Sequence, residues 1–286
     1  MKVSVTLLSA YEYCSRKLFM SRVLQVEEPP RAALVLGTIR HATFERINAE
    51  EERVVKGILR ETTFEDLVNH YKKAFGEILR IIIRENKQQL AEVEVDIKDA
   101  FRSGWKSVLL EANERAKNTY EFMEKTKHLG DALWESLTPK LHSEVRIESS
   151  RLGLKGVIDQ LREYQEYLEP VELKTGSAPQ TGLWPSHRIQ LAAYLMLLRE
   201  EYKNSHTQGV VRYLDAASTR TLQLNPFMEE EVLSLRDKVQ EVLTKGTLPE
   251  RTKNVNKCAS CPLREICYDD GRMEGLMASF SEKGKL

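Results

Sequence analysis

The sequence contains few of the residues that mark non-globular proteins. Its 286 residues include only 14 glycines and 9 prolines, too few for a fibrous or low-complexity chain, and no segment repeats. It contains no apolar run of about 18 residues or more, so we expect no transmembrane helix and no membrane partner. The first ten residues lack the cleavage site of a secretory signal, which favours a cytoplasmic location.

Neither sign of charge is in excess. The 43 lysines and arginines balance 43 aspartates and glutamates, and hydrophobic residues make up 41% of the chain. These proportions are typical of a folded globular protein with one large or two small domains. A chain with no net charge can still bind nucleic acid, but only through a local cluster of basic residues on its surface.

Cysteine is also scarce, and its placement is uneven. Cys14 stands alone near the start, whereas Cys258, Cys261 and Cys267 lie close together near the end. In a cytoplasmic protein this pattern favours metal ligation over disulfides. Zinc and a [4Fe–4S] cluster each accept four thiolates, and free structural cysteines are the remaining alternative.

Hydrophobic spacing predicts helices first and a sheet afterwards. Helices are expected at Leu7–Val26 with Ser9 as N-cap, at Val35–Asn48, through most of Phe64–Lys127, at His187–Tyr202 and at Pro226–Leu243. Strands are expected at Glu144–Glu148, Leu154–Tyr164, Tyr167–Lys174, Gly209–Leu214 and Thr219–Leu224. The order is helices, then β-β-β-α-β-β-α, then the cysteine cluster, which predicts an α/β fold.

Two expected strands carry charged residues that are costly to bury. Glu172 and Lys174 are two residues apart, so they share one face of their strand, and Asp159 lies on the partner strand of the hairpin. A divalent cation would stabilise both carboxylates, and oxygen ligands suit Mg²⁺ or Mn²⁺. The alternative is an ordinary Glu–Lys pair on a surface strand.

Three further residues extend this group. Gln190 and Tyr194 are four apart on an expected helix and therefore share a face. His41 follows Gly37-Thr-Ile-Arg and offers an imidazole as a metal ligand.

In their order along the chain, these residues resemble the motifs of RecB-like PD-(D/E)XK nucleases. The motifs are His41, Gly156-Val-Ile-Asp159, Glu172-Leu-Lys174 and Gln190-Leu-Ala-Ala-Tyr194. The resemblance implies a mixed central sheet flanked by helices and metal-dependent phosphodiester hydrolysis. It implies that His41, Asp159, Glu172 and the Leu173 carbonyl hold Mg²⁺ or Mn²⁺. Lys174 would assist the attacking water, and Gln190 and Tyr194 would position Lys174 or the DNA backbone. Glu144 would hold a metal-bound water.

The cysteine layout resembles the iron–sulfur subgroup of that family, above all the CRISPR-associated Cas4 exonucleases. The resemblance implies a [4Fe–4S] cluster on Cys14, Cys258, Cys261 and Cys267, which joins the two ends of the chain. We therefore divide the chain into N-terminal helices (1–43), a helical insertion (44–140), the nuclease core (141–245) and a C-terminal iron–sulfur region with a tail (246–286). The long insertion is the departure from compact members of the family.

These features predict a Mg²⁺- or Mn²⁺-dependent exonuclease on single-stranded DNA ends. The resemblance suggests trimming of spacer precursors beside the CRISPR integration complex, and a homo-oligomer is compatible with it. The alternatives are a DNA repair nuclease outside CRISPR, or a non-catalytic nucleic-acid-binding adaptor. The residues proposed to contact DNA are Arg16, Lys17, Arg22, Trp184, His187, Arg251, Lys253 and Lys257.

Overall fold

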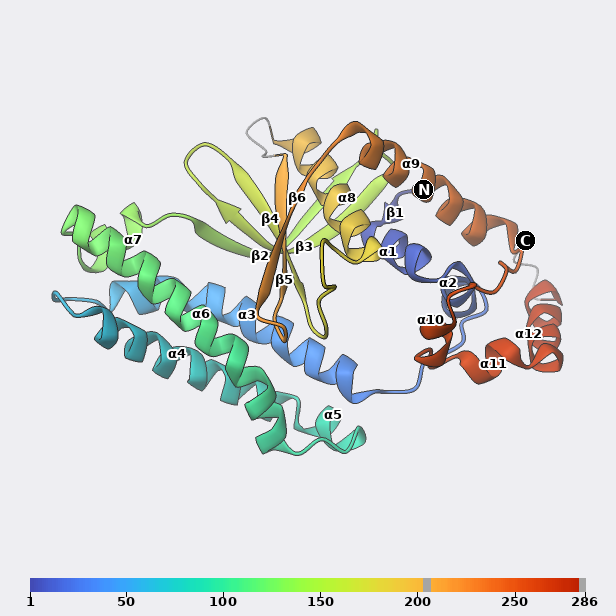
Figure 1. The fold of residues 1–286 in the computed structure, drawn as a ribbon, viewed down its shortest axis with the longest axis horizontal. Helices are drawn as coiled ribbons and strands as arrows, with labels where there is room; N and C mark the ends of the chain where they lie inside the picture. The colour runs from blue at the N-terminus through green and yellow to red at the C-terminus, as the bar shows by residue number, and fades with distance from the viewer. Residues whose placement is uncertain (203–206, 283–286) are drawn as a thin grey trace.

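A six-stranded mixed sheet forms the centre of the molecule (Figure 1). The computed structural model of the chain describes residues 1–202 and 207–282. The strands are β1 (Val3–Ser4), β2 (Lys140–Ser149), β3 (Leu154–Glu163), β4 (Leu168–Lys174), β5 (Gln208–Tyr213) and β6 (Ser218–Gln223). β3 pairs with β2 and β4 antiparallel and with β1 parallel; β4 pairs with β5 parallel, and β5 with β6 antiparallel. The predicted order β-β-β-α-β-β-α is confirmed.

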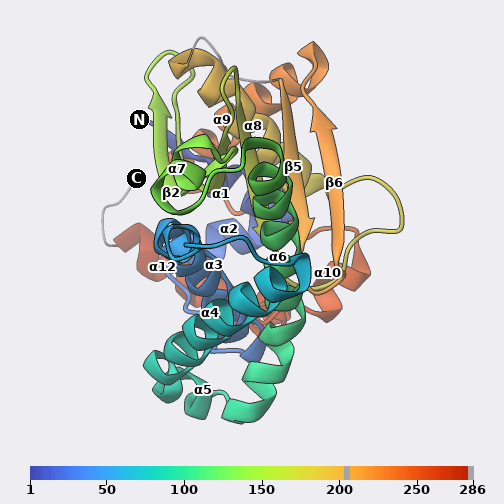
Figure 2. The ribbon, with the colours of Figure 1, turned by 90° about the vertical axis from the view of Figure 1, so that its left-hand side faces the viewer.

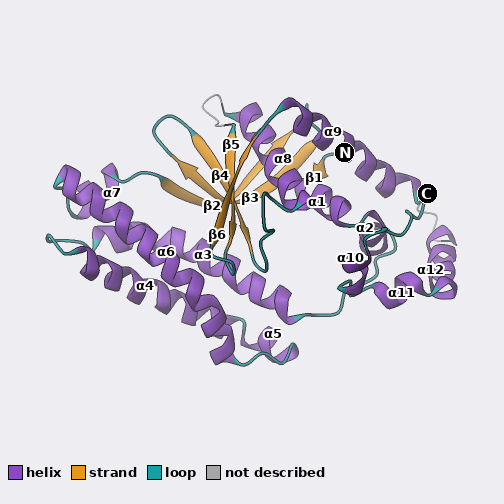
Figure 3. Ribbon diagram, in the orientation of Figure 1, coloured by secondary structure: helices purple, strands orange, loops and turns teal. Residues whose placement is uncertain are grey.

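Helices cover the sheet in two layers (Figure 3). On one side lie α1 (Val5–Tyr13), α8 (Pro185–Glu201) and α9 (Pro226–Lys245). The ten residues from Ile189 to Leu198 are all buried, so α8 is the central helix of this layer. On the other side, α3 (Ala32–Lys56) crosses β2 and β3. In the residues described, no helix is long and apolar enough to cross a membrane.

The predicted helical block is an outer layer that packs on α3 (Figure 2). It consists of α4 (Phe64–Glu85), α5 (Lys87–Glu92), α6 (Ile97–Thr126) and α7 (Gly130–Ser136). α4 and α6 approach closely at two glycines: a Cβ on Gly76 would lie 3.0 Å from the Trp105 ring, and one on Gly104 would lie 3.0 Å from Leu79. The layer has its own apolar core, centred on residues such as Tyr71 and Phe75.

A buried network of charges fastens this outer layer to the sheet. Glu111 of α6 binds Arg212 of β5 at 2.7 Å and Arg115 at 2.6 Å. Arg115 also donates to Glu51 and to the Asn48 amide oxygen, both on α3. The insertion, α3 and the sheet are therefore linked through paired charges as well as apolar contacts.

The first helix differs from its prediction. We predicted one helix at Leu7–Val26 with Ser9 as N-cap, but α1 begins at Val5 and ends at Tyr13, and α2 (Ser15–Arg22) follows. Cys14, between them, is extended (φ −166°, ψ 109°), and its thiol accepts a hydrogen bond from the Lys17 amide at 3.4 Å. The spacing missed this break because Tyr11, Cys14 and Leu18 continue the helical interval across it.

The two ends of the chain pack together. α2 lies against α10 (Val255–Ala259), α11 (Arg264–Tyr268) and α12 (Asp270–Glu282) (Figure 1). Met20, Leu263 and Met273 form a small apolar core between them. The predicted contact between the N- and C-terminal segments is therefore present.

Candidate functional site

The site begins where β3 and β4 separate. Their pairing ends at Gln160 and Val171, and the next residues in register would be Asp159 and Glu172. There the Leu173 amide donates instead to the Asp159 carboxylate at 2.8 Å. Asp159 and Glu172 are therefore neighbours in register where the pairing ends, with Asp159 beside His41 of α3 and Glu172 beside Gln190 of α8; we call this place the β3–β4 notch.

His41 reaches this notch from α3. Its Nδ1 atom lies 3.5 Å from Asp159 Oδ1. Burial lowers the pKa of His41, but the Asp159 hydrogen bond and the charges of Asp159 and Glu172 outweigh burial, so the pKa is raised. Burial and the neighbouring Asp159 also raise the pKa of Glu144, which is opposite Asp159 in the register between β2 and β3. The role proposed for Glu144, holding a metal-bound water, stays a prediction.

One hydrogen-bond network links four of the predicted site residues: Glu172, Lys174, Gln190 and Tyr194. Lys174 Nζ lies 2.7 Å from Glu172 Oε1 and donates to Gln190 Oε1 at 2.9 Å. Gln190 Nε2 donates to the same Glu172 oxygen at 2.6 Å. Tyr194 lies 3.3 Å from Gln190 and donates to the Val157 carbonyl at 2.6 Å. Gln190 and Tyr194 of α8 therefore hold the Glu172 carboxylate and the Lys174 ammonium of β4 in place.

The second Glu172 oxygen, Oε2, is buried and has no hydrogen-bond partner in the described structure. Burial raises the pKa of Glu172 to about 7, and Lys174 only partly opposes this. An unsatisfied buried carboxylate oxygen beside Asp159 and His41 fits a hard divalent cation. The chemistry of these donors suits the divalent metal that the sequence predicts, but in residues 1–202 and 207–282 no three His, Cys, Asp or Glu side chains form a group that could hold a metal ion, so the metal stays a prediction.

Gly156 has a steric reason to be glycine. A Cβ at this position would lie 2.6 Å from the Tyr194 ring. Any side chain would displace Tyr194 from the Val157 carbonyl that it binds. Two predicted motifs, one on β3 and one on α8, therefore meet in direct contact.

Two residues proposed for base stacking lie beside the site. The His187 ring bonds the Tyr213 hydroxyl at 3.1 Å, and burial together with Lys174 lowers the pKa of His187 to about 4. Trp184 is 41% exposed, and its indole N–H donates to the Ser177 carbonyl. The Trp184 ring is therefore accessible, whereas His187 is held by Tyr213.

Sequence reasoning missed a second connection to the site. Asp215, just after β5, accepts from the Gly176 amide at 2.7 Å and pairs with Arg40 at 3.0 Å. Arg40 precedes His41 on α3, and Gly176 follows the strand of Lys174. Asp215 therefore links the helix of His41 to the strand of Glu172 and Lys174. The available signal was an aspartate at the carboxyl end of an apolar strand.

A groove of about 480 Å³ leads away from Lys174 and Gln190. Lys17, Arg22 and Arg31 line it, with several serine and threonine hydroxyls and with Ser260 and Pro262 of the cysteine region. Glu28 also lines the groove, and it pairs with Lys17 at 2.8 Å and with Arg31 at 3.4 Å. Arg31 was not among the residues that the sequence singled out.

All four cysteines line one cavity between the two ends of the chain. Each is half-buried, and Arg16, Lys17 and Lys257 line the same cavity. Burial raises the pKa of the Cys261 thiol, to which Cys14 and Cys267 also contribute. Within the described ranges, no group of three or more His, Cys, Asp or Glu side chains is placed to hold a metal ion.

The other basic residues proposed for DNA contact lie in different surroundings. Arg16 is buried and donates to the Pro249 carbonyl. Lys257 donates to the Glu12 carbonyl, and Arg251 pairs with Asp270. Lys253 is exposed. Their contact with DNA stays a prediction.

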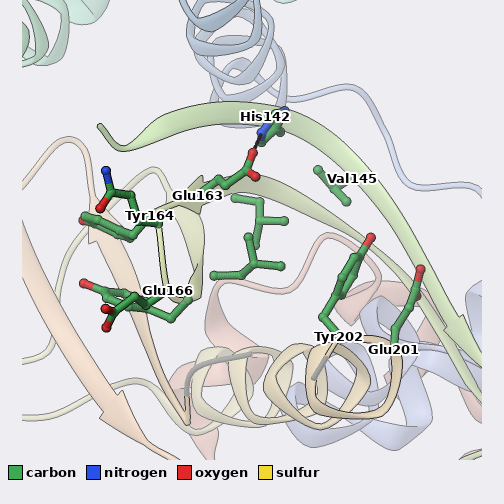
Figure 4. Close-up of a pocket in the computed structure, with 11 residues that line it drawn as sticks. His142, Val145, Glu163, Tyr164, Glu166, Glu201 and Tyr202 are labelled. Atoms are coloured by element: carbon green, nitrogen blue, oxygen red, sulfur yellow. Dashed lines mark hydrogen bonds and ion pairs between the residues drawn. The ribbon is translucent and has the colours of Figure 1, made fainter. Parts of the chain in front are cut away.

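A separate cavity of about 580 Å³ lies beyond the other end of α8 (Figure 4). Glu163, Glu166 and Glu201 line it together with Tyr164 and Tyr202. Because its charged lining is mostly acidic, it does not suit a phosphate backbone.

The chain is similar to known nucleases. A family model described as the PD-(D/E)XK nuclease superfamily matches residues 2–268. A CRISPR-associated exonuclease Cas4/endonuclease Cas1 fusion of Myxococcus xanthus is 28% identical over 45% of this chain and 23% of its own length. The exonuclease Cas4 of Rhodospirillum rubrum is 27% identical over 44% of this chain and 38% of its own.

A further relative matches nearly the whole chain. The DNA replication ATP-dependent helicase/nuclease JHS1 of Arabidopsis thaliana is 22% identical over 93% of this chain and 20% of its own length. The chain thus spans about a quarter of the length of the fusion protein and a fifth of the helicase/nuclease.

Proposed function

The chain belongs to the PD-(D/E)XK nuclease superfamily, and from this premise we propose that it hydrolyses phosphodiester bonds in DNA at the β3–β4 notch. The observation that carries the proposal is the buried Glu172 oxygen without a partner, next to Lys174, Asp159 and His41. Buried carboxylate oxygens are usually satisfied, so this one is consistent with a site that binds a further ligand.

His41, Asp159, Glu172 and the Leu173 carbonyl would hold Mg²⁺ or Mn²⁺. Their carboxylate and carbonyl oxygens suit these ions. When bound, the cation supplies Lewis-acid stabilisation of charge on the phosphate and lowers the pKa of water.

The remaining residues orient the reaction. Lys174 Nζ, held between Glu172 and Gln190, keeps a donor free to orient the attacking water and to stabilise developing negative charge. Gln190 prevents Lys174 and Glu172 from rotating, because it bonds both. Tyr194 in turn fixes Gln190 to the backbone of β3.

We infer that the substrate is single-stranded DNA and that the enzyme is an exonuclease. The groove from Lys174 past Lys17, Arg22 and Arg31 supplies cations along one path, which supports binding of one strand. The exposed Trp184 ring beside the site would stack on a base.

The four cysteines are proposed to hold a [4Fe–4S] cluster with a structural role. The cavity joins both ends of the chain, and its basic lining would stabilise four thiolates. We expect Cys261→Ala to lose iron and to lower the melting temperature, with activity lost as a consequence. A Cys261→Ala protein with full iron content and an unchanged melting temperature would contradict this role.

Two biological settings are supported by different comparisons. Similarity to Cas4 exonucleases, some fused to Cas1, supports trimming of spacer precursors with the CRISPR integration complex. The match of 93% of this chain to a replication helicase/nuclease, which includes the insertion, supports DNA replication or repair instead. Stable co-purification with the integration complex would favour the first setting.

The decisive experiment uses one anaerobic preparation. End-labelled single-stranded DNA is incubated with Mn²⁺ or EDTA, beside Lys174→Ala and the exposed control Lys238→Ala, and iron and zinc are counted. Cleavage that needs both Mn²⁺ and Lys174 supports the proposal. Iron without cleavage would leave the non-catalytic adaptor as the better explanation, and zinc without iron would replace the cluster.

A further inference from the structure

The helical insertion carries a basic cavity of about 420 Å³ on its outer surface. Arg80 and Arg84 of α4 and Lys98 and Arg102 of α6 supply its charges. Ile83, Ile97 and Phe101 are the other lining residues, and none of the lining residues is acidic. We call these seven residues the insertion patch.

The positive charge of the patch is only partly compensated. Arg80 pairs with Glu77 at 3.3 Å and Arg102 with Asp99 at 3.1 Å, and all four side chains are exposed. Such exposed pairs contribute little and exchange readily for another anion. Arg84 and Lys98 have no ion-pair partner in the part of the chain that the structure describes.

The patch also contains one half-buried aromatic ring, that of Phe101. Phe101 stacks on Trp105 with ring centres 5.5 Å apart and planes at 18°. The Arg80 guanidinium lies 5.4 Å from the centre of the Phe101 ring. A nucleotide combines a flat base with an anionic phosphate, so rings beside unpaired cations match both of its parts.

The patch lies at the end of α6 that approaches the catalytic notch. Ser103, next to Arg102, accepts hydrogen bonds from Arg40 through its carbonyl and hydroxyl oxygens, and Arg40 precedes His41. Lys98 is five residues before Ser103, or about 7.5 Å along the helix axis. Figure 1 shows this end of α6 beside α5, below α3.

We propose that the insertion patch is a second DNA-binding site, which holds the same strand at a distance from the bond that is cleaved. This proposal rests on the proposed function of the notch. The patch would bind phosphates and stack a base without reading sequence, because its cations are flexible and exposed.

This arrangement makes binding depend on strand length. A strand of about 6 nucleotides fills the notch and its groove alone, whereas a strand of about 25 nucleotides reaches the patch as well. Removing patch charges should therefore weaken binding of the long strand and leave the short strand unaffected.

The test measures fluorescence anisotropy with oligothymidylates of both lengths in EDTA, on full-length Lys174→Ala protein. The patch variant adds Arg84→Gln and Lys98→Gln. The matched control adds Lys73→Gln and Lys238→Gln, which remove the same charge from exposed positions on α4 and α9. We expect about tenfold weaker binding of the long strand by the patch variant, and a salt dependence of log Kobs that is shallower by about 1.4.

Unchanged affinity and salt dependence for the long strand would overturn the patch proposal, and equal weakening by the control would too. A second measurement separates it from the proposed function. With Lys174 intact, the patch variant should cleave the short strand at the normal rate and show a raised KM only for the long strand. Wild-type protein that cleaves neither strand would defeat the proposed function, whereas loss of short-strand cleavage in the patch variant alone would count against the patch.

Discussion

The nuclease core and the helical insertion each contain a glutamate that is only 1% exposed, Glu172 and Glu111. The two glutamates differ in how far neighbouring cations compensate their charge. Both oxygens of Glu111 in the insertion are bound, one by Arg115 and the other by Arg212. Burial alone would raise its pKa, but the two arginines outweigh burial and lower the pKa to about 2. Glu172 in the core is bound on one oxygen by Lys174 and Gln190, and its other oxygen has no partner among the described residues, so burial dominates and its pKa rises to about 7.

This difference distinguishes a structural carboxylate from a functional one. Burying a charge is costly, and Glu111 offsets the cost within the protein. Glu172 leaves part of the cost uncompensated, as expected of a group that acquires another ligand in the working enzyme. Burial alone would not separate these two glutamates, whereas the number of cationic partners does.

The largest effect is expected for Lys174→Ala. Loss of the ammonium should lower kcat by about 10²–10³, because a donor to the transition state is removed. Iron content should not change, because the cysteine cavity is lined by other residues. Single-turnover cleavage rates, with Lys238→Ala as control, check this. A Lys174→Ala rate within about threefold of wild type would contradict the catalytic role of Lys174.

Glu111→Gln should lower the free energy of unfolding by about 3 kcal/mol, because it leaves Arg115 and Arg212 short of a buried counter-charge. Glu172→Gln should lower the free energy of unfolding by less than half as much and yet abolish cleavage, because one Glu172 oxygen makes no bond to any residue that the structure describes. Urea unfolding of both variants measures the contrast. Equal losses of stability would erase the distinction between the two glutamates.

Asp215→Ala tests the connection that joins α3 to the end of β4. We expect kcat to fall about tenfold with KM unchanged, because His41 shifts relative to Glu172. Asp215→Asn should recover part of the rate, since it can still accept from the Gly176 amide. The exposed Asp237→Ala serves as control; a change in KM alone would assign Asp215 to binding instead.

The smallest expected effect is a change in the free energy of unfolding at acidic pH. The pKa of Glu111 is lower in the folded chain than its ordinary value of 4.5, so its contribution is fully present above about pH 4.5. That contribution is lost as the pH falls toward about 2. The stability difference between wild type and Glu111→Gln should therefore shrink across this window, as chemical unfolding at stepped pH would show. A difference that stays constant would contradict the depressed pKa.

The main elements and the residues of the notch could be predicted because their signals are local. Alternation around Asp159 and Glu172 indicated strands, and the spacing of Gln190 and Tyr194 indicated one helix face. The break at Cys14 could not be predicted, since a thiol cap leaves no mark in the periodicity. Asp215 was missed because its partners, Gly176 and Arg40, are 39 and 175 residues away in the chain.

The sequence by itself determined the element order and the chemical types available: carboxylates, a lysine, an imidazole and four thiols at characteristic positions. Only the tertiary structure decided how completely each charge is compensated. Two arginines bind Glu111, from α6 and β5, while Glu172 pairs with one lysine and, among residues 1–202 and 207–282, has no partner for its second oxygen. Compensation depends on distances between residues that are remote in the chain, so no local pattern encodes it.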